Sequence, residues 1–258
     1  MTEPRTVNVS VRKPSEAEIL TSEPTFRPLY QQVRERLQQR MIEGTWTPGM
    51  LLPSEGQLAA NLRVSQGTVR KALDAMAADN LLVRQQGRGT FVAVPEEGNL
   101  RFQFFRMESD EGERLTPHSE VVGFRKSRAD AFARQTLALK APSFVWEIDR
   151  VRRVAREPRI AERITVPVVR FPDLDRIGDM PNNVYALYSK RYGVTIHRVS
   201  EKLKADSLGA ADAKLLGYPQ DTPILRIVRT AFSLDGAAVE VRVSRCVMEG
   251  MAYSSELK

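Results

Sequence analysis

Hydrophobic positions in the first hundred residues predict three helices followed by a short hairpin. Between residues 29 and 43, apolar side chains recur every fourth position, which is the period of one helix face. Ser54, with a glutamine three residues on, forms a capping-box pattern that predicts a second helix. Ser65 can cap a third helix, which has its own apolar face. Two short strands, 82–84 and 90–93, then flank a turn that contains glycines.

Beyond residue 100 the pattern changes to longer strands separated by helices and turns. Two turn signals are clear, at residues 156–158 and at Asp235-Gly236. Long hairpins with interspersed helices predict an antiparallel α+β domain. The expected strands are 121–126, 143–154, 159–166, 195–205, 223–234 and 237–247, and the expected helices are 129–139, 184–192 and 208–216.

The paired helices and the hairpin predict a DNA-binding unit. Two capped helices joined by a link of about three to four residues form a helix-turn-helix, whose second helix enters the major groove. A glycine-flanked arginine at a hairpin tip can approach a phosphate or a narrow minor groove. An ordinary helical pair with a hairpin is the alternative. The candidate DNA contacts are Ser54, Ser65, Gln66, Gly67, Thr68, Arg70, Lys71, Gly87 and Arg88.

Composition permits a polyanionic partner without requiring one. The 258 residues include 39 basic and 32 acidic side chains, a formal net charge of +7. The single cysteine, Cys246, excludes an internal disulfide and fits a reducing compartment. His118 and His197, without a cysteine cluster, favour structural roles over a zinc site. Because no apolar run approaches the ~18 residues of a membrane span and the N-terminus has no apolar signal core, we expect a cytoplasmic protein without a membrane partner. We also expect no cofactor.

A series of short sequence motifs runs through the predicted DNA-binding unit. They are Pro28-Leu29-Tyr30, Pro48-Gly49, Leu52-Pro53-Ser54-Glu55, Leu58-Ala59, Val69-Arg70-Lys71-Ala72-Leu73 and Gly87-Arg88-Gly89-Thr90-Phe91-Val92. Together these motifs resemble those of the winged helix-turn-helix of GntR-type bacterial transcription regulators. The resemblance implies that the partner is a double-stranded DNA operator.

Two residues depart from the GntR pattern at positions that commonly touch DNA in the family. Gly56 stands where an arginine usually follows Pro-Ser-Glu, and Gln66 replaces the arginine that usually follows the serine opening the recognition helix. The departures imply an operator different from the family's usual one. Gln66 is suited to a bidentate contact with adenine, and Arg70 is suited to guanine.

Alternation along strand 143–154 predicts two inward-facing arginines. Arg150 and Arg152 continue the apolar face, and the returning strand brings Glu162 near them. Because burying an unpaired arginine costs several kcal/mol, two guanidiniums against one carboxylate leave about one positive charge for an anionic ligand. In the alternative, the strand emerges into solvent and these arginines form an exposed basic patch with Arg153.

Further short sequence motifs lie in the second half of the chain. They are Arg150-Val151-Arg152, Glu162 with Val166-Pro167, Val184-Tyr185 before Tyr192-Gly193, Leu216-Gly217 and Val239-Glu240. From about Leu100 to Tyr253 the chain resembles a UTRA domain, the effector-binding module of the HutC branch of GntR regulators. The resemblance implies a chorismate-lyase-like antiparallel sheet, a homodimer and a small-molecule pocket. At the family's ligand positions stand Arg150, Arg152, Glu162, Asn183 and Glu240.

This UTRA-like region also departs from the family. Asn183 stands where a serine is usual, and residues 103–106 replace a Ser-Phe-Thr phosphate loop. Both changes favour a carboxylate effector over a phosphorylated metabolite. Glu240 shares a strand face with Arg242, opposite the face of Val239. Either that strand is buried on both faces, or Glu240 is a surface residue.

The resulting plan has a mobile arm (1–25), a winged helix-turn-helix (26–93), a linker (94–99) and an effector-binding and dimerisation domain (100–258). We expect a DNA-binding regulator, with repression the commoner family outcome, whose operator binding responds to a small anionic metabolite. Two alternatives stay open. One is a lyase-like enzyme acting on a small carboxylate, although the sequence offers no nucleophile–base pair. The other is a nucleoid-associated DNA binder without an effector.

Overall fold

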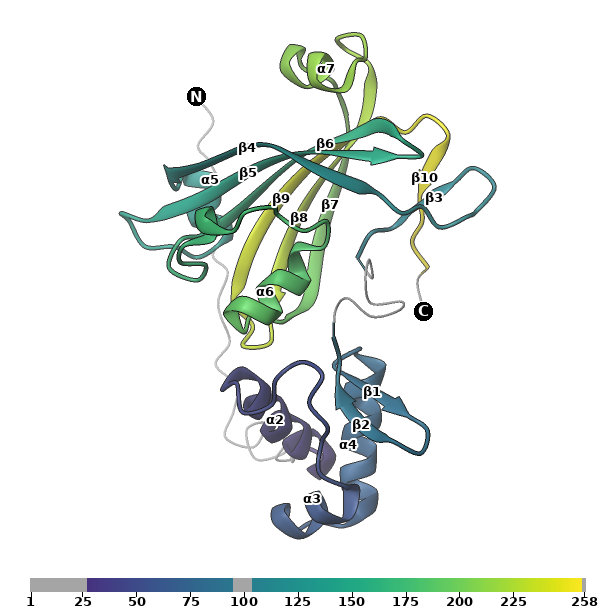
Figure 1. Cartoon of the computed structure of the whole chain (residues 1–258), viewed down its shortest axis with the longest axis vertical. Coiled ribbons are helices and arrows are strands. Elements are labelled where there is room, and N and C mark those ends of the chain that lie inside the picture. The colour runs from purple at the N-terminus through teal and green to yellow at the C-terminus, as the bar shows by residue number, and fades with distance from the viewer. Residues whose placement is uncertain (1–26, 95–103, 257–258) are drawn as a thin grey trace, which may run out of the picture.

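The structure, a computed structural model, describes residues 27–94 and 104–256. Figure 1 shows a small unit of helices with a two-stranded hairpin and a larger unit built on a six-stranded sheet. The expected arm (1–25) and most of the expected linker (94–99) lie outside the described residues. Within the described ranges, no helix is long and apolar enough to cross a membrane.

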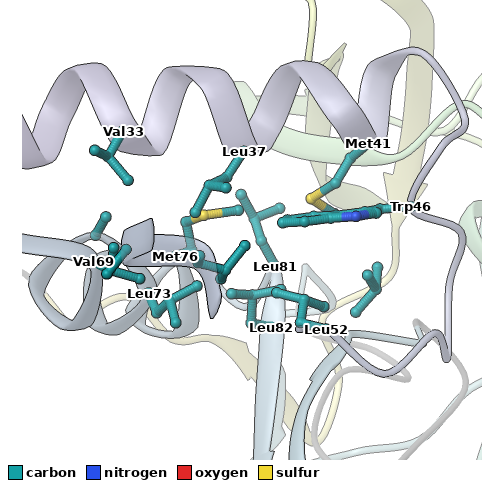
Figure 2. Packing of buried hydrophobic residues seen from close by; sticks show 14 residues of the cluster. Val33, Leu37, Met41, Trp46, Leu52, Val69, Leu73, Met76, Leu81 and Leu82 are labelled. Atoms are coloured by element: carbon teal, nitrogen blue, oxygen red, sulfur yellow. The ribbon is translucent and has the colours of Figure 1, made fainter. Parts of the chain in front are cut away.

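The small unit packs two helices face to face around a single apolar core. In Figure 2, Leu37 and Met41 of the first helix point toward Leu73 and Met76 of the third, with Trp46 beside them. This packing buries one face of the third helix and leaves the other face exposed. The elements are α2 (Leu29–Ile42), α3 (Glu55–Leu62), α4 (Gln66–Ala78), β1 (Leu82–Gln85) and β2 (Gly89–Val92).

Local hydrogen bonds define the starts of α3 and α4. The predicted capping box is confirmed: Ser54 Oγ accepts from the Gln57 N–H at 3.3 Å, and Gln57 Oε1 accepts from the Ser54 N–H at 2.9 Å. Ser65 Oγ accepts from the Thr68 N–H at 3.1 Å and caps α4 as predicted. Arg63, with a positive φ of 55°, ends α3 and turns the chain into α4.

The larger unit is an antiparallel sheet with strand order β4-β5-β6-β9-β8-β7, accompanied by a separate β10-β3 pair. Its α+β class is therefore as predicted. Its elements are β3 (Met107–Ser109), β4 (His118–Arg128), α5 (Ala131–Thr136), β5 (Phe144–Val154), β6 (Glu157–Pro167), η2 (Leu174–Arg176), α6 (Val184–Tyr192), β7 (Ile196–Ser207), α7 (Ala210–Leu216), β8 (Pro223–Ser233), β9 (Ala238–Cys246) and β10 (Met251–Tyr253).

The helix predicted at 129–139 is shorter than expected. Asp130 caps its start by accepting from the Ala133 N–H at 2.6 Å, so Ala129 stays outside α5. Ala138 takes a positive φ of 50° just beyond its end, which a continuing helix does not allow. Strands β3 and β10, of three residues each, were not predicted.

The turn predicted at 156–158 is displaced. Ala155 and Arg156 have positive φ values of 49° and 72° and form the two-residue hairpin turn themselves. Glu157 and Pro158 instead begin β6, where Pro158 lies opposite Arg153 beside a register shift. Such an irregular position tolerates a residue that lacks a backbone N–H.

Helices cover both faces of the sheet. On one face, Ile148 and Ile164 pack with Val184 and Tyr188 of α6. On the other, Val151 and Ala161 pack with residues of α7. Because successive strand residues point to opposite faces, this double coverage buries the central strands on both sides.

Candidate functional site

The exposed face of α4 presents the predicted DNA-contacting side chains. It carries Gln66, Gly67, Arg70 and Lys71 in its first two turns. The Arg70 guanidinium is held by Glu55 of α3, because its Nε and Nη2 each lie 2.9 Å from Glu55 Oε2. The Lys71 ammonium lies 4.5 Å from the centre of the Tyr30 ring on α2. The face is therefore basic, and the contact with Glu55 fixes the direction of its arginine, Arg70.

Three hydroxyl residues of the predicted contact set stabilise the helix starts. Ser54 and Ser65 serve as the N-caps of α3 and α4. The Thr68 and Ser65 hydroxyl oxygens lie 2.9 Å apart. These side chains position the helices, and any contact that they make with DNA would be additional to this role.

The hairpin tip has the backbone shape that a DNA-contacting wing needs. Gly87 and Gly89 have positive φ values of 72° and 113°. A Cβ at Gly89 would lie 2.7 Å from Leu51 Cδ1, so the exposed Leu51 side chain would have to move, and the φ of 113° itself disfavours any residue but glycine. Arg88, between the two glycines, is exposed, and its guanidinium lies 5.9 Å from the centre of the Phe91 ring.

In the larger unit, a row of buried charges crosses the α6-covered face of the sheet. Arg150 and Glu162 are direct cross-strand partners, and both side chains are 1% exposed. Arg150 Nε and Nη2 donate to Glu162 Oε1 at 3.0 and 2.5 Å. Arg152 Nη1 lies farther from Glu162, at 3.5 Å from Oε2, and its Nε donates to Ser119 Oγ at 3.1 Å. Arg150 and Arg152 thus point inward, whereas the Arg153 side chain is 42% exposed.

A second half of the row lies on β9 and was only partly foreseen. Glu240 is fully buried and accepts from Arg242 Nε and Nη2 at 2.9 and 3.0 Å. The hydroxyls of Tyr185 and Tyr188 on α6 also donate to Glu240, at 3.0 and 2.9 Å. Of the two alternatives for Glu240, the strand buried on both faces is the one observed. Arg242 reaches back to Glu162 at 3.5 Å, so it links the two halves.

Arg229 and Glu201 extend the row, and the sequence did not single them out. Arg229 on β8 donates to Glu201 on β7 at 2.7 Å and also to the backbone carbonyl of Phe104. The Tyr253 hydroxyl donates to the same glutamate. Their alternation was visible in the sequence, but the strand order that aligns them with β9 and β6 was not.

The row carries a surplus of positive charge. Four guanidiniums, of residues 150, 152, 229 and 242, meet three carboxylates, of residues 162, 201 and 240, among the described residues. Burial alone would raise the pKa of Glu162, but the guanidiniums of Arg242, Arg150 and Arg152 outweigh it and hold that pKa well below its usual range. Burial, reinforced by the neighbouring guanidiniums, lowers the pKa of Arg152 and is only partly offset by Glu162. Arg152 is therefore the least compensated cation of the row.

A cavity of about 20 Å³ opens beside Arg152 and Arg229, large enough for about one water molecule. Its wall includes Glu162, Ser244 and Cys246. Phe105 also lines it, and the centre of its ring lies 4.6 Å from the Arg152 guanidinium carbon.

Asn183, the fifth predicted effector residue, caps α6 by accepting from the Tyr185 N–H at 3.2 Å. The backbone carbonyl of its neighbour Asn182 accepts from Arg150 Nη1 at 3.4 Å. Throughout the described ranges, no group of three or more His, Cys, Asp or Glu side chains could hold a metal ion.

The small unit has the helix pair and hairpin of a winged helix-turn-helix, a class of DNA-binding unit whose second helix enters the major groove. Residues 29–92 match the family described as bacterial regulatory proteins, gntR family, and residues 112–251 match the UTRA domain. The chain therefore belongs to the GntR family and carries a UTRA domain. The resemblance to GntR regulators of the HutC branch, inferred from the sequence motifs, is confirmed.

Known relatives share both halves of the chain. The mannosyl-D-glycerate transport/metabolism system repressor MngR of Escherichia coli is 31% identical, over 83% of this chain and 89% of that protein. The HTH-type transcriptional repressor NagR of Bacillus subtilis is 28% identical, over 83% of this chain and 88% of that protein. The crystal structure of PhnF from Mycobacterium smegmatis has a TM-score of 0.53 at 25% identity, covering 88% of this chain and 99% of that chain.

Proposed function

We propose that this protein is a transcriptional repressor that binds a double-stranded operator through residues 26–93. A small anionic metabolite bound within residues 100–258 changes its operator affinity. The exposed basic face of α4, set in a winged helix-turn-helix, carries the first part of the proposal. The relatives MngR and NagR, both named as repressors, support the direction of control.

DNA recognition divides between side chains that read bases and side chains that bind phosphate. Arg70 is the proposed base reader and Lys71 a proposed phosphate contact, with Gln66, Thr68 and Arg88 around them. Duplexes selected from a random pool by the full-length protein provide the test. Arg70→Ala should weaken binding to the selected duplex by about tenfold and relax its sequence preference. Lys71→Ala should weaken all duplexes alike and reduce the salt slope by about 1. A wild-type protein that selects no sequence would contradict operator binding.

The positive surplus of the buried row supports an anionic ligand. Arg150 and Arg152 are the proposed anion-binding residues, and Arg229 joins them. Arg152 and Arg229 line the small cavity, whereas Arg150 is bonded to Glu162 and does not line it. Glu162 and Glu240 hold the guanidiniums in place, and Asn183 sets the start of α6 beside them. A carboxylate entering between Arg152 and Arg229 would supply the missing negative charge and take the place of the Phe105 ring. The small volume and the phenylalanines at 104–105 favour a carboxylate over a sugar phosphate.

A thermal-shift screen of small carboxylic acids and phosphorylated metabolites tests this part. We expect a carboxylate to raise the melting temperature of the full-length protein, because a ligand that binds only the native state stabilises it. If only phosphorylated compounds stabilise the protein, the carboxylate assignment is wrong. Turnover of the stabilising acid would instead favour the lyase-like alternative.

A direct contact between the two units offers a route by which ligand binding can change the DNA-binding unit. Leu234, in the turn between β8 and β9, packs against the apolar core of the small unit. The same strand β9 carries Glu240 and Arg242 of the buried row. A shift of β9 on ligand binding would therefore reach the packing behind α4. Coupling between two such sites is typically worth ~1–3 kcal/mol.

The active species is proposed to be a homodimer held mainly by residues 100–258. Each chain offers one recognition helix, and a two-fold dimer would read two half-sites about 34–36 Å apart. Sedimentation of the full-length protein with and without the selected duplex tests this assignment. A monomer that binds one half-site with the full affinity would contradict it.

A further inference from the structure

The DNA-facing surface contains a carboxylate whose role the proposed function leaves open. We propose that Glu55 is a specificity-determining positioning residue, which holds Arg70 so that one edge of its guanidinium faces a single base pair. This inference rests on the proposed DNA-binding function. It concerns how sequence is read, and it adds a residue of α3 to the determinants on α4.

The geometry divides the donors of Arg70 into two edges. Nε and Nη2 are directed to Glu55 Oε2, both at 2.9 Å. A guanidinium has five N–H donors in one plane, so the edge formed by Nη1 and the second Nη2 hydrogen stays available. Two parallel donors on one edge match the O6 and N7 acceptors of guanine in the major groove. The contact with Glu55 therefore orients Arg70 without consuming the donors that a guanine needs.

Glu55 is itself anchored, so it can serve as a fixed reference. Its second oxygen, Oε1, lies 3.3 Å from Arg84 Nη2 on β1. Arg84 is held in turn by Asp74 of α4, with Nη2 donating to Oδ1 at 2.6 Å. The Glu55 side chain is only 17% exposed, whereas that of Arg70 is 58% exposed. The less mobile partner thus sets the direction of the more mobile one.

The neighbouring residue leaves this arrangement undisturbed. Gly56 has no side chain, and a Cβ built there would meet nothing within 4 Å. No basic side chain at position 56 therefore competes with Arg70 for the carboxylate. The hydrogen bond from Arg70, with the charges of Arg70 and Arg84, lowers the pKa of Glu55 despite burial, so the carboxylate is ionised at neutral pH.

Loss of Glu55 should have two opposite effects on DNA binding. A negative charge facing the duplex repels its phosphates, so removing that charge should raise the affinity for every sequence. Without its partner, Arg70 is free to turn toward phosphates as well as toward the base, so discrimination at its base pair should fall. A purely structural role for Glu55 would instead lower stability and leave base preference unchanged.

Asp74→Asn is the matched control for Glu55→Gln. It removes one negative charge from the same surface, and the asparagine oxygen can still accept from Arg84 Nη2, so the anchor of Glu55 is kept. The probe is the duplex that full-length wild type selects from a random pool. A series in which each base pair is replaced in turn is then measured by fluorescence anisotropy. Arg70→Ala identifies which base pair Arg70 reads.

Wild type and Asp74→Asn should lose about tenfold or more in affinity when that base pair is replaced. Glu55→Gln should lose at most about twofold there, while keeping the wild-type preference at the other positions. Its general affinity should rise as much as that of Asp74→Asn. In an Arg70→Ala background, Glu55→Gln should leave discrimination unchanged, because the arginine that Glu55 positions is gone.

Glu55→Asp provides a second variant that keeps both the charge and an acidic residue at the start of α3. It should lose discrimination without gaining general affinity, because the shorter side chain does not reach Arg70. If Glu55→Gln and Glu55→Asp, both with wild-type melting temperatures, discriminate like wild type, the inference is overturned and the DNA-binding function stands. If wild type selects no duplex at all, the DNA-binding function itself fails.

Discussion

Each half of the protein holds an arginine against a glutamate, but in opposite surroundings. Arg70 and Glu55 lie on the surface of the small unit, with side chains 58% and 17% exposed. Arg150 and Glu162 lie inside the sheet domain, where both side chains are 1% exposed. The hydrogen-bond distances are similar in the two pairs, so the difference lies in the solvent around them.

Solvent decides what each pair can contribute. An exposed ion pair is worth ~0–1 kcal/mol, because water screens it and the long side chains lose entropy. The Glu55 pair therefore sets a direction more than it stabilises the fold. A buried guanidinium, in contrast, costs several kcal/mol unless a carboxylate accompanies it. In the part of the chain that the structure describes, the buried row holds four guanidiniums against three carboxylates, and an anionic ligand can compensate this surplus positive charge.

The largest expected effect comes from breaking the buried pair. Glu162→Gln removes the carboxylate that Arg150, Arg152 and Arg242 share. We expect the free energy of unfolding at pH 7 to fall by ~3–5 kcal/mol, measured by urea denaturation of the full-length protein. Glu249→Gln, which removes a 72% exposed partner of Arg159, should change it by less than ~1 kcal/mol. Equal effects in the two variants would show that burial does not distinguish the pairs.

Acid should erase much of that difference. The folded-state pKa of Glu162 is held well below its usual range, and a carboxyl of this kind stabilises the fold above its unfolded pKa. That contribution is lost as the pH falls from about 4.3 toward the folded pKa. The stability gap between wild type and Glu162→Gln should therefore narrow below about pH 4. If the gap widens in acid, Glu162 is not an ionised carboxylate in the folded protein at neutral pH.

The next effect concerns ligand binding. Arg152→Lys keeps a positive charge but loses the planar fork, so the affinity for the carboxylate found by screening should fall about tenfold or more. Arg153→Lys, on the next residue and 42% exposed, should bind like wild type. Calorimetry on both variants decides. Equal ligand affinities of Arg152→Lys and Arg153→Lys would mean that the ligand binds outside the row.

A smaller effect is expected at the contact between the two units. Leu234→Ala removes most of the side chain that packs against the small unit's core. Operator affinity without ligand and ligand affinity without DNA should both stay near wild type, while the coupling between them shrinks by ~1 kcal/mol. Anisotropy titrations with and without ligand measure all three quantities. Leu203→Ala, at an exposed leucine of β7, is the control and should leave the coupling unchanged.

The smallest effect is expected at a helix cap. Ser54→Ala removes the hydroxyl that accepts from the Gln57 N–H, so thermal unfolding should show a loss of ~1 kcal/mol. Ser207→Ala, at an exposed serine that ends β7, should cost less than ~0.5 kcal/mol. A larger cost than at Glu162 would invert the ranking that solvent exposure predicts.

The same contrast explains how far the sequence could be read. The small unit depends on local signals, so Ser54, Gln57 and Ser65 placed its helices correctly. The buried row depends on long-range pairing. Arg150 and Glu162 are joined by one hairpin and could be predicted, whereas Arg229 and Glu201 required the strand order β6-β9-β8-β7. The turn at Ala155 and Arg156 was misplaced because neither residue type signals a positive φ.

The central claim is that an anion held by the buried arginines changes DNA binding by the exposed ones. The most direct measurement is the affinity of the full-length protein for its selected duplex, with and without a saturating carboxylate, in wild type and in Arg152→Lys. We predict that the ligand shifts wild-type affinity by about 5–150-fold. At the same ligand concentration, it should leave Arg152→Lys within about twofold of its ligand-free value. The same shift in both proteins, or no shift in wild type at saturation, would contradict the claim.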